Sequence, residues 1–116
     1  MKINGVELDF HLFDEDKSEI RERYFEELNK MKTIKKDQPN STEAEKSKYL
    51  CDRIKSMFDN VFGEGTGKAA CGEGNDLLSH LTAYEELVAE QIRQNEAYKR
   101  VMGSLKNVGK FPTLKS

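Results

Sequence analysis

The most reactive side chains in this chain belong to two cysteines and two histidines. Cys71 lies in a glycine-rich stretch and precedes a predicted helix that contains His80. A helix start can lower the pKa of a nearby thiol, and a histidine can act as its base. However, position 80 falls beside the apolar residues Leu78 and Leu81, which favours a histidine packed in or near the core. We therefore predict no catalytic residue and no enzymatic activity.

A zinc site would require His11, Cys51, Cys71 and His80 to converge. Structural zinc ligands usually occur as closely spaced pairs, whereas nineteen residues separate Cys51 from Cys71. Cys51 follows an apolar stripe residue and is interpreted as a small core or boundary residue. Two cysteines also make no disulfide framework, which indicates a reducing cytoplasm. We predict no bound metal and no cofactor.

The glycine-rich stretch from Gly63 to Lys68 could be compared with a phosphate-binding loop. That loop requires a glycine five positions before its last glycine and a hydroxyl after its lysine. Phe62 and Ala69 occupy those positions here. The stretch also follows a predicted helix, whereas a phosphate-binding loop follows a strand. We therefore interpret residues 63–74 as a glycine-rich connector that needs positive φ angles.

Charge and hydropathy exclude several classes of partner. The chain has 116 residues and a net charge of -2, and no basic helix face is interleaved with aromatic residues, so nucleic-acid binding is not expected. No segment approaches the roughly 20 apolar residues that cross a bilayer. The charges are unevenly placed, because acids outnumber bases in residues 14–27 and every charge after Tyr98 is basic. Such ends could let copies meet head to tail, or they could be ordinary solvated faces.

The N-terminal residues predict a short β-hairpin. Asn4-Gly5 is a strong signal for a two-residue turn, and residues 6–12 then alternate between apolar and polar side chains. The first arm is very short. Because a two-stranded hairpin is marginally stable alone, we expect it to pack on a helix or on a second copy.

Three helices are expected after the hairpin. The first covers about residues 15–35, with an acidic residue at its start, and ends before Pro39. The second begins near Asn40, with Glu43 completing a capping arrangement, and ends at Phe62-Gly63. The third and longest follows the glycine-rich loop and ends near Gly103. Its apolar face is expected to contain Leu77, Leu78, Leu81, Tyr84, Leu87, Val88 and Ile92.

These patterns predict a mainly α (α+β) fold: an N-terminal β-hairpin followed by three helices. Residues 1–104 would form a single helical domain and residues 105–116 a flexible basic tail. A thirty-residue helix is about 45 Å long, which exceeds what the two shorter helices can cover. Tyr98, Val101 and Met102 would then stay exposed and available to a protein partner.

Three segments of the chain resemble a family of small uncharacterised proteins encoded by phages and prophages of Gram-positive bacteria. They are the run Ile3-Asn4-Gly5-Val6-Glu7-Leu8-Asp9-Phe10, the run Met57-Phe58-Asp59-Asn60-Val61-Phe62-Gly63-Glu64-Gly65-Thr66, and the run Ala83-Tyr84-Glu85-Glu86-Leu87-Val88. The resemblance covers roughly residues 1–94. Residues 67–72 depart from the family pattern, in which an aromatic residue tends to follow the glycine-threonine run.

The resemblance implies a role in a tail-gene module, as a tail assembly chaperone or minor tail accessory protein. Its partners would be phage tail proteins or further copies of itself, in the host cytoplasm, with association with the virion as an alternative. Phe58 and Phe62 could dock a partner, but the favoured interpretation is that both rings fill the core, since aromatic residues dominate core burial. The alternative function is a prophage-encoded regulator or inhibitor that binds a host protein.

Overall fold

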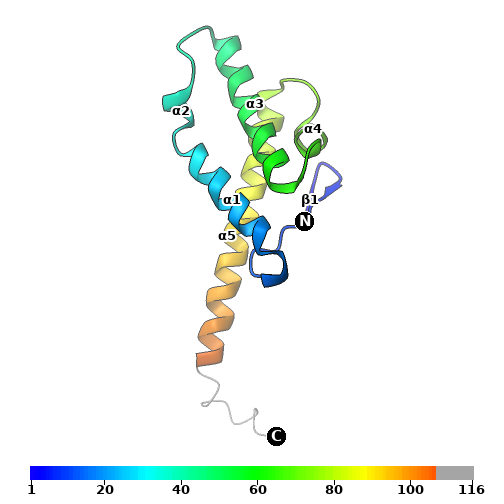
Figure 1. The fold of residues 1–116 in the computed structure, drawn as a ribbon, viewed down its shortest axis with the longest axis vertical. Coiled ribbons are helices and arrows are strands. Elements are labelled where there is room, and N and C mark those ends of the chain that lie inside the picture. The colour runs from blue at the N-terminus through cyan, green and yellow to red at the C-terminus, as the bar shows by residue number, and fades with distance from the viewer. Residues whose placement is uncertain (107–116) are drawn as a thin grey trace, which may run out of the picture.

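A computed structural model describes residues 1–106 and shows a mainly helical protein with a small antiparallel sheet at its N-terminus (Figure 1). In chain order the elements are β1 (Lys2–Ile3), β2 (Val6–Glu7), a 3-10 turn η1 (Glu15–Lys17), α1 (Ser18–Met31), α2 (Ile34–Asp37), α3 (Glu43–Phe62), α4 (Thr66–Cys71) and α5 (Leu77–Lys106). The radius of gyration is 18.1 Å and the longest extent is 65 Å. A compact chain of this length would have a radius near 13 Å, so the molecule is elongated.

The predicted hairpin is confirmed. Asn4 and Gly5 both have positive φ angles, 50° and 78°, and β1 pairs antiparallel with β2 with Lys2 opposite Glu7. The prediction that the second arm extends to residue 12 is wrong, since β2 ends at Glu7 and the last backbone bonds between the two arms join Leu8 to Met1. The alternation nevertheless continues in the extended segment that follows, and its buried members are Leu8, Phe10 and Leu12.

The predicted first helix is divided in the structure. Asp14 accepts a hydrogen bond from the Asp16 amide and starts η1, then α1 ends at Met31, and α2 is a separate short helix. Thr33 lies at the break, where its hydroxyl contacts the Lys30 carbonyl oxygen at 3.3 Å and the Asp37 carboxylate at 2.9 Å. A β-branched side chain that bonds locally in this way competes with helix continuation.

The second predicted helix is α3, and it begins two residues later than Asn40 suggested. Thr42 is the cap, because its hydroxyl oxygen accepts a hydrogen bond from the Glu45 amide at 3.2 Å. One face of α3 supplies much of the core. Its buried residues are Cys51, Ile54, Met57, Phe58 and Val61.

The expectation of an irregular glycine-rich loop at residues 63–74 is wrong in its centre, where α4 forms. Gly63, Gly65 and Gly72 take positive φ angles on either side of it. Gly67 lies inside α4, and its amide donates to the Asp59 carboxylate at 2.7 Å. A Cβ atom at Gly67 would be only 2.5 Å from the carbonyl oxygen of Lys55. The glycine therefore lets α4 approach the α3 backbone closely.

The last helix is the longest, as predicted, but Gly103 does not end it, since α5 continues to Lys106. One isolated glycine costs a helix only about 1 kcal/mol, so the helix can continue through Gly103. Residues 105 and 106 of the predicted flexible tail are therefore helical, and residues 107–116 lie outside the described part of the chain.

The predicted apolar face of α5 is also partly wrong. The residues of α5 that are buried are His80, Ala83 and Leu87, whereas Leu78, Leu81 and Ile92 are 74%, 42% and 52% exposed. The face of α5 that packs against α3 and α4 is therefore rotated about the helix axis from the face that is richest in leucine. The core itself is one cluster with members from the N-terminal segment, α1, α3, α4 and α5.

Candidate protein-binding surface

A single stripe of side chains runs along the whole of α5 at alternating spacings of three and four residues, so its members share one face of the helix. In chain order they are Leu77, His80, Tyr84, Leu87, Gln91, Gln94, Tyr98, Val101 and Leu105. The body of the protein covers this face as far as Gln94. Tyr98, Val101 and Leu105 are 46%, 57% and 59% exposed. The stripe therefore continues beyond the part of α5 that the rest of the chain covers.

Gln94 marks where that cover ends. Its Oε1 atom accepts a hydrogen bond from the Leu12 amide at 2.8 Å, and its Nε2 atom donates to the Phe10 carbonyl oxygen at 2.6 Å. One turn earlier, the Gln91 Oε1 atom accepts from the Tyr24 hydroxyl at 3.2 Å. These polar residues of the stripe fasten the segment before η1 and helix α1 to α5.

Glu90 supports this attachment. It accepts a hydrogen bond from Gln94 Nε2 at 2.8 Å and a two-pronged pair of bonds from Arg93 at 2.8 and 2.6 Å. The bonds from Arg93, followed by the one from Gln94, lower the pKa of the Glu90 carboxyl to about 2. Glu90 is therefore charged throughout the neutral range and holds the Gln94 amide in place.

Beyond Gln94, Phe13 extends the apolar surface sideways from α5. Its ring stacks on that of Tyr98 with centroids 4.3 Å apart and an angle of 3° between the planes. The two rings remain 44% and 46% exposed. Two parallel aromatic rings left half in solvent form an apolar platform at the edge of the folded body.

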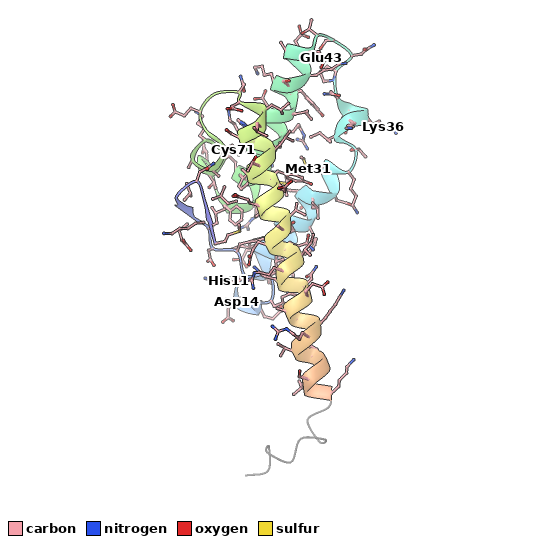
Figure 2. All side chains as sticks on the ribbon, turned by 180° about the vertical axis from the view of Figure 1, so that it is seen from behind. His11, Asp14, Met31, Lys36, Glu43 and Cys71 are labelled. Carbon is pink, nitrogen blue, oxygen red and sulfur yellow. The ribbon has the colours of Figure 1, made fainter. Side chains whose placement is uncertain are left out.

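An open groove of about 670 Å³ lies between the segment around η1 and this part of α5. Its apolar walls include Phe13, Ala97, Tyr98 and Val101, and its polar rim includes His11 and Asp14. Figure 2 shows His11 and Asp14 beside α5, and the helix continues well past them. We name the set Phe13, Tyr98, Val101, Met102 and Leu105 the α5 end surface.

The structure separates the residues predicted to contact a partner. Phe58 is fully buried, so its ring fills the core and is not available at the surface. Phe62 is half-buried and packs edge-on against Phe10, with centroids 5.6 Å apart. Tyr98 and Val101 are exposed, and Met102 is half-buried.

Phe13 and Leu105 were missed by the sequence analysis. Leu105 could have been found by continuing the three-four count past Gly103. The position of Phe13 depends on the bonds of Gln94 to the preceding segment, for which the sequence carries no signal.

The cysteines and histidines do not form a reactive site. Cys51 and Cys71 are both buried free thiols, and burial raises the pKa of Cys71 to about 11. His80 is fully buried, with its Nδ1 atom 2.6 Å from the Asp76 carbonyl oxygen and its Nε2 atom buried without a hydrogen-bond partner. Within residues 1–106, no three His, Cys, Asp or Glu side chains converge as a metal site requires.

The glycine-rich region also lacks the geometry of a phosphate cradle. The Gly67 amide at the start of α4 is already bonded to the Asp59 carboxylate, which would repel an anion at that place. Lys68 is exposed on a helix of only six residues. These contacts indicate a structural role for residues 63–74.

Comparison with known proteins gives one match. A family model described as a family of unknown function (DUF6673) matches residues 4–112. The chain belongs to this family. No curated protein and no solved structure matches it significantly. Among the helices of residues 1–106, none combines the length and apolar character needed to span a bilayer. Membership of DUF6673 assigns no activity.

Proposed function

We propose that this protein acts by binding other proteins through the α5 end surface. The observation that carries the proposal is the continuation of the α5 stripe beyond Gln94, where Tyr98, Val101 and Leu105 are each about half exposed. A helix that presents an apolar stripe at this spacing is a common element of helix-in-groove and helix-pair recognition. Exposed apolar side chains gathered at one place also mark interaction sites more often than scattered ones do.

The other exposed apolar residues of α5 support this role less well. Leu78, Leu81 and Ile92 lie on the outward side of the helix, and the exposed acids Glu85 and Glu86 lie between them in the chain. Charged residues are depleted at the centre of protein interfaces. The α5 end surface combines an aromatic platform with a groove, so it is the stronger candidate.

We further propose that the partners belong to a phage or prophage tail-gene module and that binding takes place in the host cytoplasm during assembly. The resemblance of the runs around Gly5, Gly63 and Glu86 to small phage-encoded proteins supports this part. In such a module the protein would act as a tail assembly chaperone or minor accessory protein. A binding surface of modest size on a charged, elongated carrier suits a protein that must associate with a partner and later release it.

Co-purification tests this function. The tagged full chain is expressed with the complete tail-gene module, and the recovered proteins are identified and quantified by mass spectrometry. We expect recovery of a tail-module product and at least a ten-fold loss with Val101→Lys, because a buried anchor costs about 2 kcal/mol or more when removed. Leu78→Lys is the matched control, because Leu78 is an apolar residue at the opposite end of α5 and is 74% exposed, against 57% for Val101.

Three outcomes would contradict the proposal. Unchanged recovery with Val101→Lys would exclude the α5 end surface. Loss of recovery with Leu78→Lys alone would move the binding site to the outward side of the helix. Recovery of a host protein in the absence of other phage genes would instead support the regulator function.

A further inference from the structure

We infer that the α5 end surface binds a second copy of this chain, with the two α5 helices antiparallel. This inference rests on the proposed function, since it names the partner of the same surface. It is carried by two observations: the register of the exposed stripe and its area.

The exposed stripe is complementary to itself when one helix is reversed. If the two-fold axis lies between Lys99 and Arg100, Tyr98 of each copy faces Val101 of the other. Leu105 of each copy then reaches the level of Gln94 in the other, beside the groove walled by Phe13, Ala97 and Tyr98. The side chains that are exposed in one copy are therefore covered by those exposed in the second, as a symmetric interface requires.

The area fits a weak dimer. A large apolar or aromatic side chain carries roughly 200 Å² of surface, so Phe13, Tyr98, Val101 and Leu105, which are 44%, 46%, 57% and 59% exposed, each offer about 100 Å². With part of Met102 and with the second copy, the covered surface is about 900 Å², which is in the range of weak, transient interfaces. We therefore expect a dimer that dissociates in the micromolar range.

Sedimentation equilibrium of the full chain over a range of concentrations tests the dimer. We expect a monomer–dimer equilibrium whose dissociation constant rises at least thirty-fold with Val101→Lys and stays within three-fold of the wild type with Leu78→Lys. Both positions are exposed, so both variants should fold. Thermal unfolding of each variant at low concentration checks this.

Cysteine cross-linking tests the direction of the helices. In the antiparallel pair, the two copies of residue 105 are about 16 Å apart along the axis, whereas residue 97 of one copy lies about 5 Å along the axis from residue 105 of the other. A mixture of Ala97→Cys and Leu105→Cys chains should therefore form a disulfide dimer on mild oxidation, and Leu105→Cys alone should not. The wild type is the control, since its own thiols are buried.

The outcomes separate this inference from the function on which it rests. A monomer at all concentrations, or rapid cross-linking of Leu105→Cys with itself, overturns the antiparallel dimer. If the wild type is monomeric but Val101→Lys still loses its tail-module partner, the proposed function stands and only the second copy as occupant is wrong. If neither assay responds to Val101→Lys, both proposals fail.

Discussion

Substitution of Gly67 by alanine should destabilise the protein by forcing α4 away from α3. Gly67 lies where α4 crosses α3, and the new Cβ would be 2.5 Å from the Lys55 carbonyl oxygen and 2.8 Å from its Cα atom. Both are backbone atoms of a long helix and cannot rotate away. Helix α4 must therefore retreat by about 1 Å, which strains the bond from the Gly67 amide to Asp59.

The expected loss of stability follows from three contributions. Overpacking of this kind costs about 1–3 kcal/mol, and weakening a hydrogen bond to a carboxylate costs about 1.5–3 kcal/mol when it is lost completely. Alanine returns about 1 kcal/mol through its higher helix propensity. The net destabilisation is about 2–3 kcal/mol, which for a chain of this size lowers the melting temperature by roughly 10 °C.

Thermal and urea unfolding followed by circular dichroism measure this effect. Gly74→Ala is the matched control, because a Cβ atom there meets no atom within 4 Å and its φ angle is not positive. We expect Gly74→Ala to melt within a few degrees of the wild type. A Gly67→Ala protein that melts as high as the control would refute the close approach of α4 to α3.

Three further predictions concern single residues. The pKa of Glu90 is about 2 against an ordinary value of 4.5. The stabilisation that Glu90 provides is therefore complete above pH 4.5 and is lost as the pH falls towards 2. Glu90→Gln should reduce the change in the free energy of unfolding over this pH range, as measured by urea unfolding, and an unaltered pH dependence would contradict the role of its bonds to Arg93. Gly103→Ala should stabilise the end of α5 by about 1 kcal/mol, since its Cβ meets nothing within 4 Å; hydrogen exchange at that end should slow, and faster exchange would indicate a clash that the structure does not show. Cys71 should react with iodoacetamide far more slowly in the folded protein than in denaturant, because it is buried and its pKa is raised to about 11; equal rates would show that the thiol is open to solvent.

The parts of the fold that were predictable depend on local signals. Asn4-Gly5 fixes its turn through two positive φ angles, and the spacing of apolar residues in α3 identifies its buried face. The parts that were not predictable depend on distant contacts. Helix α4 contains a glycine and would not be stable alone, yet it forms because Asp59 bonds to the Gly67 amide and α3 supports it.

The candidate surface was predictable in the same uneven way. Tyr98 and Val101 could be proposed because helix length alone showed that α5 exceeds its cover. The point at which the rest of the chain stops covering α5 could not be predicted. It is set by the hydrogen bonds of Gln94, a polar residue that is left out when only apolar positions are counted. Phe58 is an aromatic residue, a type that is common at protein interfaces. It lies on the face of α3 that packs against the core, so it is buried.

Amide hydrogen exchange over residues 98–106 tests the central claim most directly. It would be measured for the full chain at low concentration and again in the complex recovered with its tail-module partner. We predict that these amides exchange at least ten-fold more slowly in the complex, while exchange at the exposed face around Leu78 is unchanged. Unaltered exchange at residues 98–106, with slowing elsewhere on the molecule, would contradict the assignment of the α5 end as the binding surface.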